Sequence, residues 1–110
     1  MVNVSSSGSL YPLPIVVPYG SAKAALNHMT RSLAAEYGPN VRVNTRCPGP
    51  FLTDIADAWE PERRERTDNA LGRPGRPEEI VTAALFLVSP ASSFTTGALV
   101  RVDGGMVIGQ

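Results

Sequence analysis

The fold is decided by residues 16–38, VVPYGSAKAALNHMTRSLAAEYG, which predict a long amphipathic helix. We expect this helix to run from Tyr19 to Tyr37, since Gly38 and Pro39 form a helix-ending pair. Its buried face is predicted from side chains that recur at helical spacing, namely Leu26, Thr30, Leu33 and Tyr37.

Tyr19 and Lys23 lie four positions apart and therefore fall on this same inward face. A lysine is out of place there, because an amphipathic helix normally turns its charges toward water. A tyrosine hydroxyl with its ordinary pKa of about 10 is a poor base near neutral pH. An ammonium about 4 Å away, at an effective dielectric constant of about 20, favours the tyrosinate by roughly 4 kcal/mol. Lys23 is therefore a candidate to activate Tyr19 in proton transfer, and a lysine that reaches past the tyrosine to solvent is the alternative.

The totals exclude several classes of protein. The chain has 110 residues, which suits one domain, and ten basic side chains balance ten acidic ones. Without a basic cluster, neither nucleic acid nor an anionic membrane is predicted as a partner, and the run PERRER at 61–66 is expected on a solvated helix face. No apolar run is long enough to span a bilayer and no signal-peptide pattern is present, so we expect a cytoplasmic protein.

Two residues bear on metal and redox chemistry. The single cysteine, Cys47, lies in a strand pattern and is expected to be a buried thiol in a reducing compartment. The single histidine, His28, is predicted on the outer helix face with no second ligand nearby, so no metal site is expected.

The remaining segments alternate between strands and helices. Strands are predicted at 2–4 (VNV), 41–47 (VRVNTRC) and 98–105 (ALVRVDGG), and a second helix opens at Pro77. Its buried stripe is expected to contain Ile80, Ala84, Leu87 and Val88. The order strand, helix, strand, helix, strand predicts an α/β fold with a parallel sheet and right-handed crossovers.

Two right-handed crossovers that step in the same direction would place both helices on one face of the sheet. The other face would then be bare, although parallel sheets are normally covered on both sides. We therefore expect an exposed sheet face that includes Val2, Val4, Val41 and Val43.

Five separated motifs occur in the order VNVSSSG, YGSAK, VRVNTRCPGPFLT, GRPEEI and TTGALVRVDGG. In this order the chain resembles the C-terminal half of a short-chain dehydrogenase/reductase, nearest to the 3-oxoacyl-ACP reductases and the sugar dehydrogenases. The resemblance covers essentially all of residues 1–110. It implies one partial domain, the C-terminal part of a Rossmann-like doubly wound parallel sheet, with the N-terminal cofactor half missing.

The resemblance also implies roles for three catalytic residues. Tyr19 would be the general acid/base, and Lys23 would support it and hydrogen-bond the nicotinamide ribose. Ser6, thirteen positions before the tyrosine, would hold the substrate carbonyl or hydroxyl, and its neighbours Ser5 and Ser7 are less favoured. Hydride would pass between NAD or NADP and a carbonyl/alcohol substrate.

The stretch PGPFLT resembles the family's cofactor loop. By that resemblance Pro48 and Gly49 would let the backbone approach the nicotinamide, and Phe51 and Thr53 would fix the cofactor. A simple strand-ending turn is the alternative, because Pro-Gly-Pro is sufficient for one.

Residues 50–72 correspond to the family's substrate lid. Within this segment Trp59 would either touch the substrate or only pack the lid onto the body. Arg46 departs from the apolar residue expected at its strand position. It would either reach the surface left by the missing half or reflect relaxed selection.

The alternative function is a catalytically inactive, truncated fragment that only associates with itself or with a complementary chain. In the family the tyrosine helix packs against its twin, which implies a homo-oligomer formed through helix 19–37. The candidate contact residues are Asn27, His28, Arg31 and Ala35.

Overall fold

The sheet contains three parallel strands, β1 (Val2–Val4), β2 (Asn44–Pro48) and β3 (Leu99–Val102), in the spatial order β1-β2-β3. The computed structural model describes residues 1–108, apart from the side chain of Ile55. The predicted order of strands and helices and the parallel sheet are confirmed. β2 begins at Asn44, three residues later than the alternating pattern predicted.

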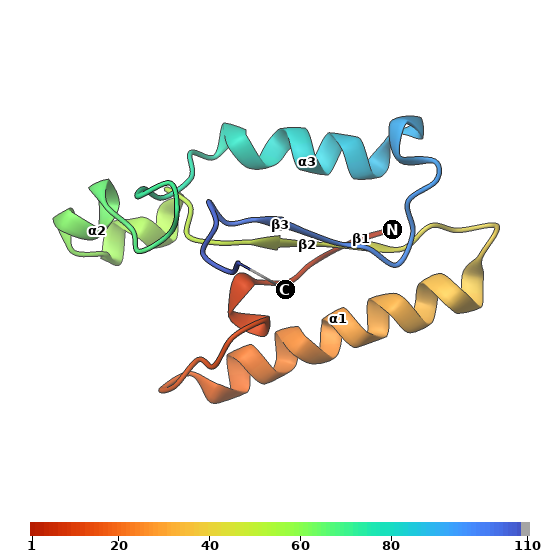
Figure 1. Ribbon diagram of the computed structural model, residues 1–110, viewed down its shortest axis with the longest axis horizontal. Coiled ribbons are helices and arrows are strands. Elements are labelled where there is room, and N and C mark those ends of the chain that lie inside the picture. The colour runs from red at the N-terminus through yellow and green to blue at the C-terminus, as the bar shows by residue number, and fades with distance from the viewer. Residues whose placement is uncertain (109–110) are drawn as a thin grey trace.

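The two long helices cover opposite faces of this sheet (Figure 1). α1 (Val17–Tyr37) lies on one side and contacts β2, whereas α3 (Glu78–Val88) lies on the other and contacts all three strands. The prediction that both helices share one face and leave the other bare is therefore wrong. Of the four valines expected on the bare face, Val43 is completely buried, Val2 is half-buried, and Val4 and Val41 are exposed.

The handedness of one crossover explains this difference. Because both connections step in the same direction along the sheet, helices on opposite faces require one connection that is not right-handed. The connection between β2 and β3, residues 49–98, is the longer of the two. It passes through η2 (Asp54–Ala58) and α2 (Pro61–Glu65) before α3, and through η3 (Pro90–Ser92) after it.

α1 begins at Val17, two residues before the predicted start, and Pro18 lies in its first turn, where a missing N–H costs nothing. Its fully buried side chains are Asn27, Thr30 and Ala34. Thr30 is buried, as predicted. Tyr37, which was predicted on the same buried face, is 47% exposed. The inward face of α1 is thus more polar and rotated relative to the predicted one.

Hydrogen bonds between side chains explain why polar groups are buried under α1. The Thr30 hydroxyl donates to the Leu26 carbonyl at 2.9 Å and accepts from the Asn3 amide at 2.9 Å and from the Thr45 hydroxyl at 2.7 Å. Asn27 donates to the Ser9 hydroxyl at 2.7 Å. Asn27 is therefore part of the interior, and its prediction as an outer contact residue is wrong.

α3 buries its apolar side less completely than predicted. Leu87 is 2% exposed, and Ile80 and Ala84 are half-buried. Val88 was expected in the same stripe but is 65% exposed, because it is the last residue of the helix and lies where the chain turns toward η3.

The hydroxyl of Thr30 gives a first testable prediction. Thr30→Val keeps the shape of the side chain but leaves the Asn3 amide and the Thr45 hydroxyl without a buried partner. We expect the free energy of unfolding to fall by about 1–3 kcal/mol, measured by urea denaturation. Ser32→Ala, on the exposed side of α1, is the control and should change stability little. Equal stability of Thr30→Val and the parent would show that the hydroxyl network is unimportant.

Candidate functional site

A crevice of about 400 Å³ lies beyond the carboxyl ends of β1 and β2. Open parallel sheets bind their ligands at this edge. The strands bring the loops that follow them to the crevice, and the N-terminal turn of α1 and the segment 53–63 complete its walls. Six of the predicted site residues line it, namely Ser6, Tyr19, Pro48, Gly49, Phe51 and Thr53.

The three consecutive serines after β1 have different surroundings. Ser5 is buried, and its hydroxyl donates to the Lys23 carbonyl at 3.1 Å. Ser7 is buried, and its hydroxyl contacts the Met106 sulfur at 3.7 Å. Ser6 is half-buried, and its Oγ accepts a hydrogen bond from the Gly8 N–H at 3.1 Å. That bond does not commit the proton of the Ser6 hydroxyl, so Ser6 is the serine best placed to donate to a ligand.

Lys23 lies behind Tyr19 and does not line the crevice directly. Its ammonium is 5.9 Å from the centroid of the Tyr19 ring. The same ammonium donates to the Val4 carbonyl at 3.0 Å. The end of β1 thus holds the ammonium near Tyr19 through a hydrogen bond that is exposed to solvent. Two of the three ammonium protons remain for other acceptors.

The loop that follows β2 is packed against the end of β3. A Cβ at Gly49 would lie 2.8 Å from both Cα and Cβ of Asp103, which is closer than a real side chain allows. The Asp103 carboxylate in turn accepts from the backbone N–H groups of Gly105 and Val107 at 2.9 and 3.1 Å. Glycine is thus required at position 49 by packing within the chain, whatever else approaches it.

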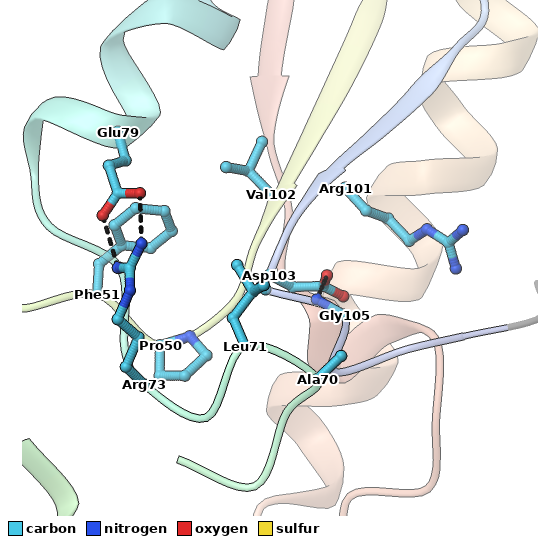
Figure 2. Close-up of a pocket in the computed structure, with 12 residues that line it drawn as sticks. Pro50, Phe51, Ala70, Leu71, Arg73, Glu79, Arg101, Val102, Asp103 and Gly105 are labelled. Carbon is cyan, nitrogen blue, oxygen red and sulfur yellow. Dashed lines mark hydrogen bonds and ion pairs between the residues drawn. The ribbon is translucent and has the colours of Figure 1, made fainter. Parts of the chain in front are cut away.

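A second contact fixes the same loop from the side of α3. Figure 2 shows the Arg73 guanidinium and the Glu79 carboxylate facing one another beside the ring of Phe51. The two groups form a two-point ion pair with distances of 2.8 and 3.0 Å. Gly75 forms a β-bridge with Phe51, and a Cβ there would lie 2.5 Å from the Phe51 ring. The ion pair therefore holds the chain that supports the predicted cofactor loop.

Cys47 lies in β2, next to the residues that open the crevice, and is completely buried, as predicted. Burial raises the pKa of its thiol, and hydrogen bonds with Ser5 and Ser9 oppose this shift only in part. The thiol therefore stays protonated near neutral pH and acts as a packing group.

Several residues of the crevice were not predicted from the sequence. Tyr11, whose hydroxyl contacts the Met106 sulfur at 3.6 Å, forms one wall together with Met106. Arg63 was expected on a solvated helix face but also lines the crevice. No local pattern could reveal Tyr11 and Met106, because 95 residues separate them. Arg63 belongs to the segment that resembles the substrate lid, which is a reason to expect it near the crevice. The mixed charges of PERRER instead led to the prediction of a solvated helix face.

The described part of the chain has neither a candidate metal site nor a candidate membrane-spanning helix. Residues 1–108 contain no group of three or more histidine, cysteine or acidic side chains that could hold a metal ion. None of the helices among these residues is both long and apolar enough to cross a membrane.

Comparison with known proteins supports the resemblance over the whole chain. A family model described as enoyl-(acyl carrier protein) reductase matches residues 1–107. Sorbose reductase from Candida albicans is 43% identical over an alignment of 109 positions that covers 96% of this chain and 39% of that protein. The 3-oxoacyl-[acyl-carrier-protein] reductase from Thermotoga maritima is 40% identical, over 98% of this chain and 45% of the relative.

Solved structures agree with the sequence relatives. The crystal structure of 3-oxoacyl-[acyl-carrier protein] reductase from Brucella melitensis matches with a TM-score of 0.88 and 38% identity, covering 98% of this chain and 42% of that one. A short-chain dehydrogenase/reductase from the same organism matches with a TM-score of 0.89 and 34% identity, covering 98% and 45%. The chain spans less than half the length of each of these relatives.

The ion pair beside Phe51 predicts a pH dependence. Hydrogen bonds from the Arg73 guanidinium, and then from the Arg76 backbone N–H, lower the pKa of Glu79 from 4.5 to about 2. Since the pKa is lower in the folded state, this stabilisation is fully present above pH 4.5 and is lost as the pH falls toward 2.

We therefore expect Glu79→Gln to lower the urea midpoint at pH 7, and the gap to the parent to shrink as the pH falls through this range. Glu78→Gln is the matched control, because Glu78 is more exposed and pairs only with Arg76, at 3.2 Å. A gap that does not change with pH would contradict the assignment.

Proposed function

Because the chain belongs to the short-chain dehydrogenase/reductase family, we propose that it provides the catalytic half of an NAD(P)-dependent oxidoreductase that interconverts a carbonyl and an alcohol. The observation that carries this proposal is the convergence of Ser6, Tyr19 and the 48–53 loop on one crevice, with Lys23 held directly behind Tyr19.

In this proposal Tyr19 moves the proton. Its side chain is 49% exposed toward the crevice, so the hydroxyl is open to a substrate oxygen. In the reducing direction Tyr19 donates its proton to the oxygen that becomes the alcohol, and in the oxidising direction it accepts that proton. The Lys23 ammonium favours the charge that remains on the phenolate oxygen after donation.

Ser6 is proposed to hold the same substrate oxygen. Its hydroxyl proton is not committed to the bond with Gly8, so it can donate to a carbonyl oxygen from beside Tyr19. Two donors on one oxygen orient the carbonyl and stabilise the negative charge that develops there. The free hydroxyl proton of Ser6 supports a positioning and electrostatic role for it in this proposal, whereas Ser5 and Ser7 are occupied in the interior.

The hydrogen-bonding groups of these residues are chemically suited to bind a nicotinamide cofactor. A bound nicotinamide would supply or accept the hydride. Lys23 has ammonium protons available for vicinal hydroxyls such as those of a ribose. Pro48, Gly49, Phe51 and Thr53 line the neighbouring crevice. Two related structures, of 4-hydroxyisoleucine dehydrogenase and of 7α-hydroxysteroid dehydrogenase, are complexes with NADH. The choice between NAD and NADP stays open for this chain.

Self-association through α1 is part of the proposal. His28, Arg31 and Ala35 are exposed on the side of α1 that faces away from the sheet, so they are free to contact a second copy. Asn27 is excluded from this set because it is buried.

The cofactor proposal is tested by titrating the purified chain with NADH and NADPH while following cofactor fluorescence. We expect saturable binding that Lys23→Ala weakens by about tenfold or more, because a charge-assisted hydrogen bond is lost. Arg66→Ala removes a positive charge from an exposed position outside the crevice and should leave cofactor binding unchanged.

The catalytic role is tested with Tyr19→Phe, which keeps the ring and removes only the hydroxyl. We expect turnover of a carbonyl substrate panel to fall by about 10²-fold or more while cofactor binding remains. A chain that is folded by circular dichroism but binds neither cofactor would instead support the alternative, a catalytically silent chain that only associates.

A further inference from the structure

Arg63 is the feature of the crevice that the proposed reaction does not use. It lies on α2 and lines the crevice together with Trp59, and its guanidinium carbon is 4.9 Å from the centroid of the Trp59 ring. Such a contact engages the face of the guanidinium. The N–H groups lie at its edge, where they can bind a carboxylate or phosphate in a two-point geometry.

Two nearby arginines, Arg64 and Arg73, are engaged, whereas Arg63 is not. Arg64 donates to the carbonyls of Ala56 and Asp57 and pairs with the Asp57 carboxylate at 3.6 Å, and Arg73 pairs with Glu79. Among residues 1–108 the Arg63 side chain makes no hydrogen bond or ion pair. Arg63 is thus an exposed residue in the wall of the crevice, and its guanidinium has no partner from the described chain.

A second guanidinium points to the same conclusion. Arg46 is half-buried on β2 and lines the same crevice, and within the described part of the chain its side chain also lacks a hydrogen bond or ion pair. A half-buried charge without a partner is costly. None of the crevice-lining side chains among residues 1–108 is a carboxylate. The crevice therefore has a positive charge balance that an anion would complete.

We propose that the substrate of this crevice carries an anionic group, a carboxylate or phosphate, and that Arg63 binds it while Trp59 holds the guanidinium in place. The proposal rests on the proposed function in one respect, because it assigns the anion to the carbonyl/alcohol substrate. The substrate then reaches from the hydroxyls of Tyr19 and Ser6 to the lid. Trp59 acts as a positioning residue for Arg63.

Trp59 provides the readout, since it is the only tryptophan of the chain. We would follow Trp59 fluorescence while titrating 4-oxopentanoate and its longer methyl-ketone homologues, 5-oxohexanoate and 6-oxoheptanoate, each against its methyl ester. Acid and ester share the ketone and the chain length and differ in charge. We expect at least one acid to bind about tenfold or more tightly than its ester, as a charge-assisted hydrogen bond requires.

Two variants decide whether Arg63 is responsible. Arg63→Met removes the charge but keeps an unbranched side chain that can lie on Trp59, and it should abolish the preference for the acid. Arg66→Met removes the same charge from an exposed position outside the crevice and should keep the preference. Circular dichroism of both variants checks that the fold is retained. Equal binding of every acid and ester, or a preference that survives in Arg63→Met, would overturn the proposal.

A further measurement, NADH binding to Arg63→Met, shows whether the anion that Arg63 binds belongs to the substrate or to the cofactor. If Arg63 instead held a cofactor phosphate, Arg63→Met would weaken NADH binding and the acids would show no advantage over their esters, which overturns the proposal. The fluorescence titration needs neither cofactor nor turnover. Failure of NADH binding with a retained preference for acids would therefore refute the oxidoreductase function and leave anion binding at Arg63 intact.

Discussion

The arrangement of the site depends on a reciprocal pair of hydrogen bonds between the end of β1 and the second turn of α1. Ser5 donates its hydroxyl to the Lys23 carbonyl, and Lys23 donates its ammonium to the Val4 carbonyl. One bond fixes the helix backbone and the other fixes the side chain that lies behind Tyr19. The strand and the helix therefore hold each other in register, and Ser6 is left between them facing the crevice. An apolar contact is less directional than a hydrogen bond, so it would fix neither the helix backbone nor the lysine side chain as specifically.

The interior under α1 is also held together by hydrogen bonds. Thr30, Thr45 and Asn3 form a connected group of hydrogen bonds where a helix on a sheet would ordinarily bury aliphatic side chains. Such a network stabilises the fold only when every member finds its partner, so it favours one position of the helix over its neighbours. On the opposite face, the Arg73–Glu79 ion pair and the contact of Gly49 with Asp103 fix the loop after β2. The crevice is thus formed between two rigid supports.

Much of this could be predicted from the sequence, because the decisive signals are local. The position of α1, its end at Tyr37, the parallel order of the strands and the burial of Cys47 follow from periodicity and from Gly and Pro signals. The face occupied by α3 could not be predicted, since handedness depends on the path of a long connection. The buried Asn27 was misplaced because its partner, Ser9, lies 18 residues away. The crevice wall at Tyr11 and Met106 could not be predicted for the same reason, because a tertiary contact alone forms it.

The register of the sheet has a consequence for how the chain folds. Every strand pairing joins residues more than 40 positions apart, from Val2 with Asn44 to Pro48 with Val102. The loop entropy of each closure must be overcome before any ladder bond forms, and it grows slowly with loop length. The backbone hydrogen bonds within α1 are all local, so this helix can form early, but the sheet cannot begin from a hairpin. Folding should therefore be slow for a chain of this length, with a rate set by the first meeting of distant strands on a helix that is already present.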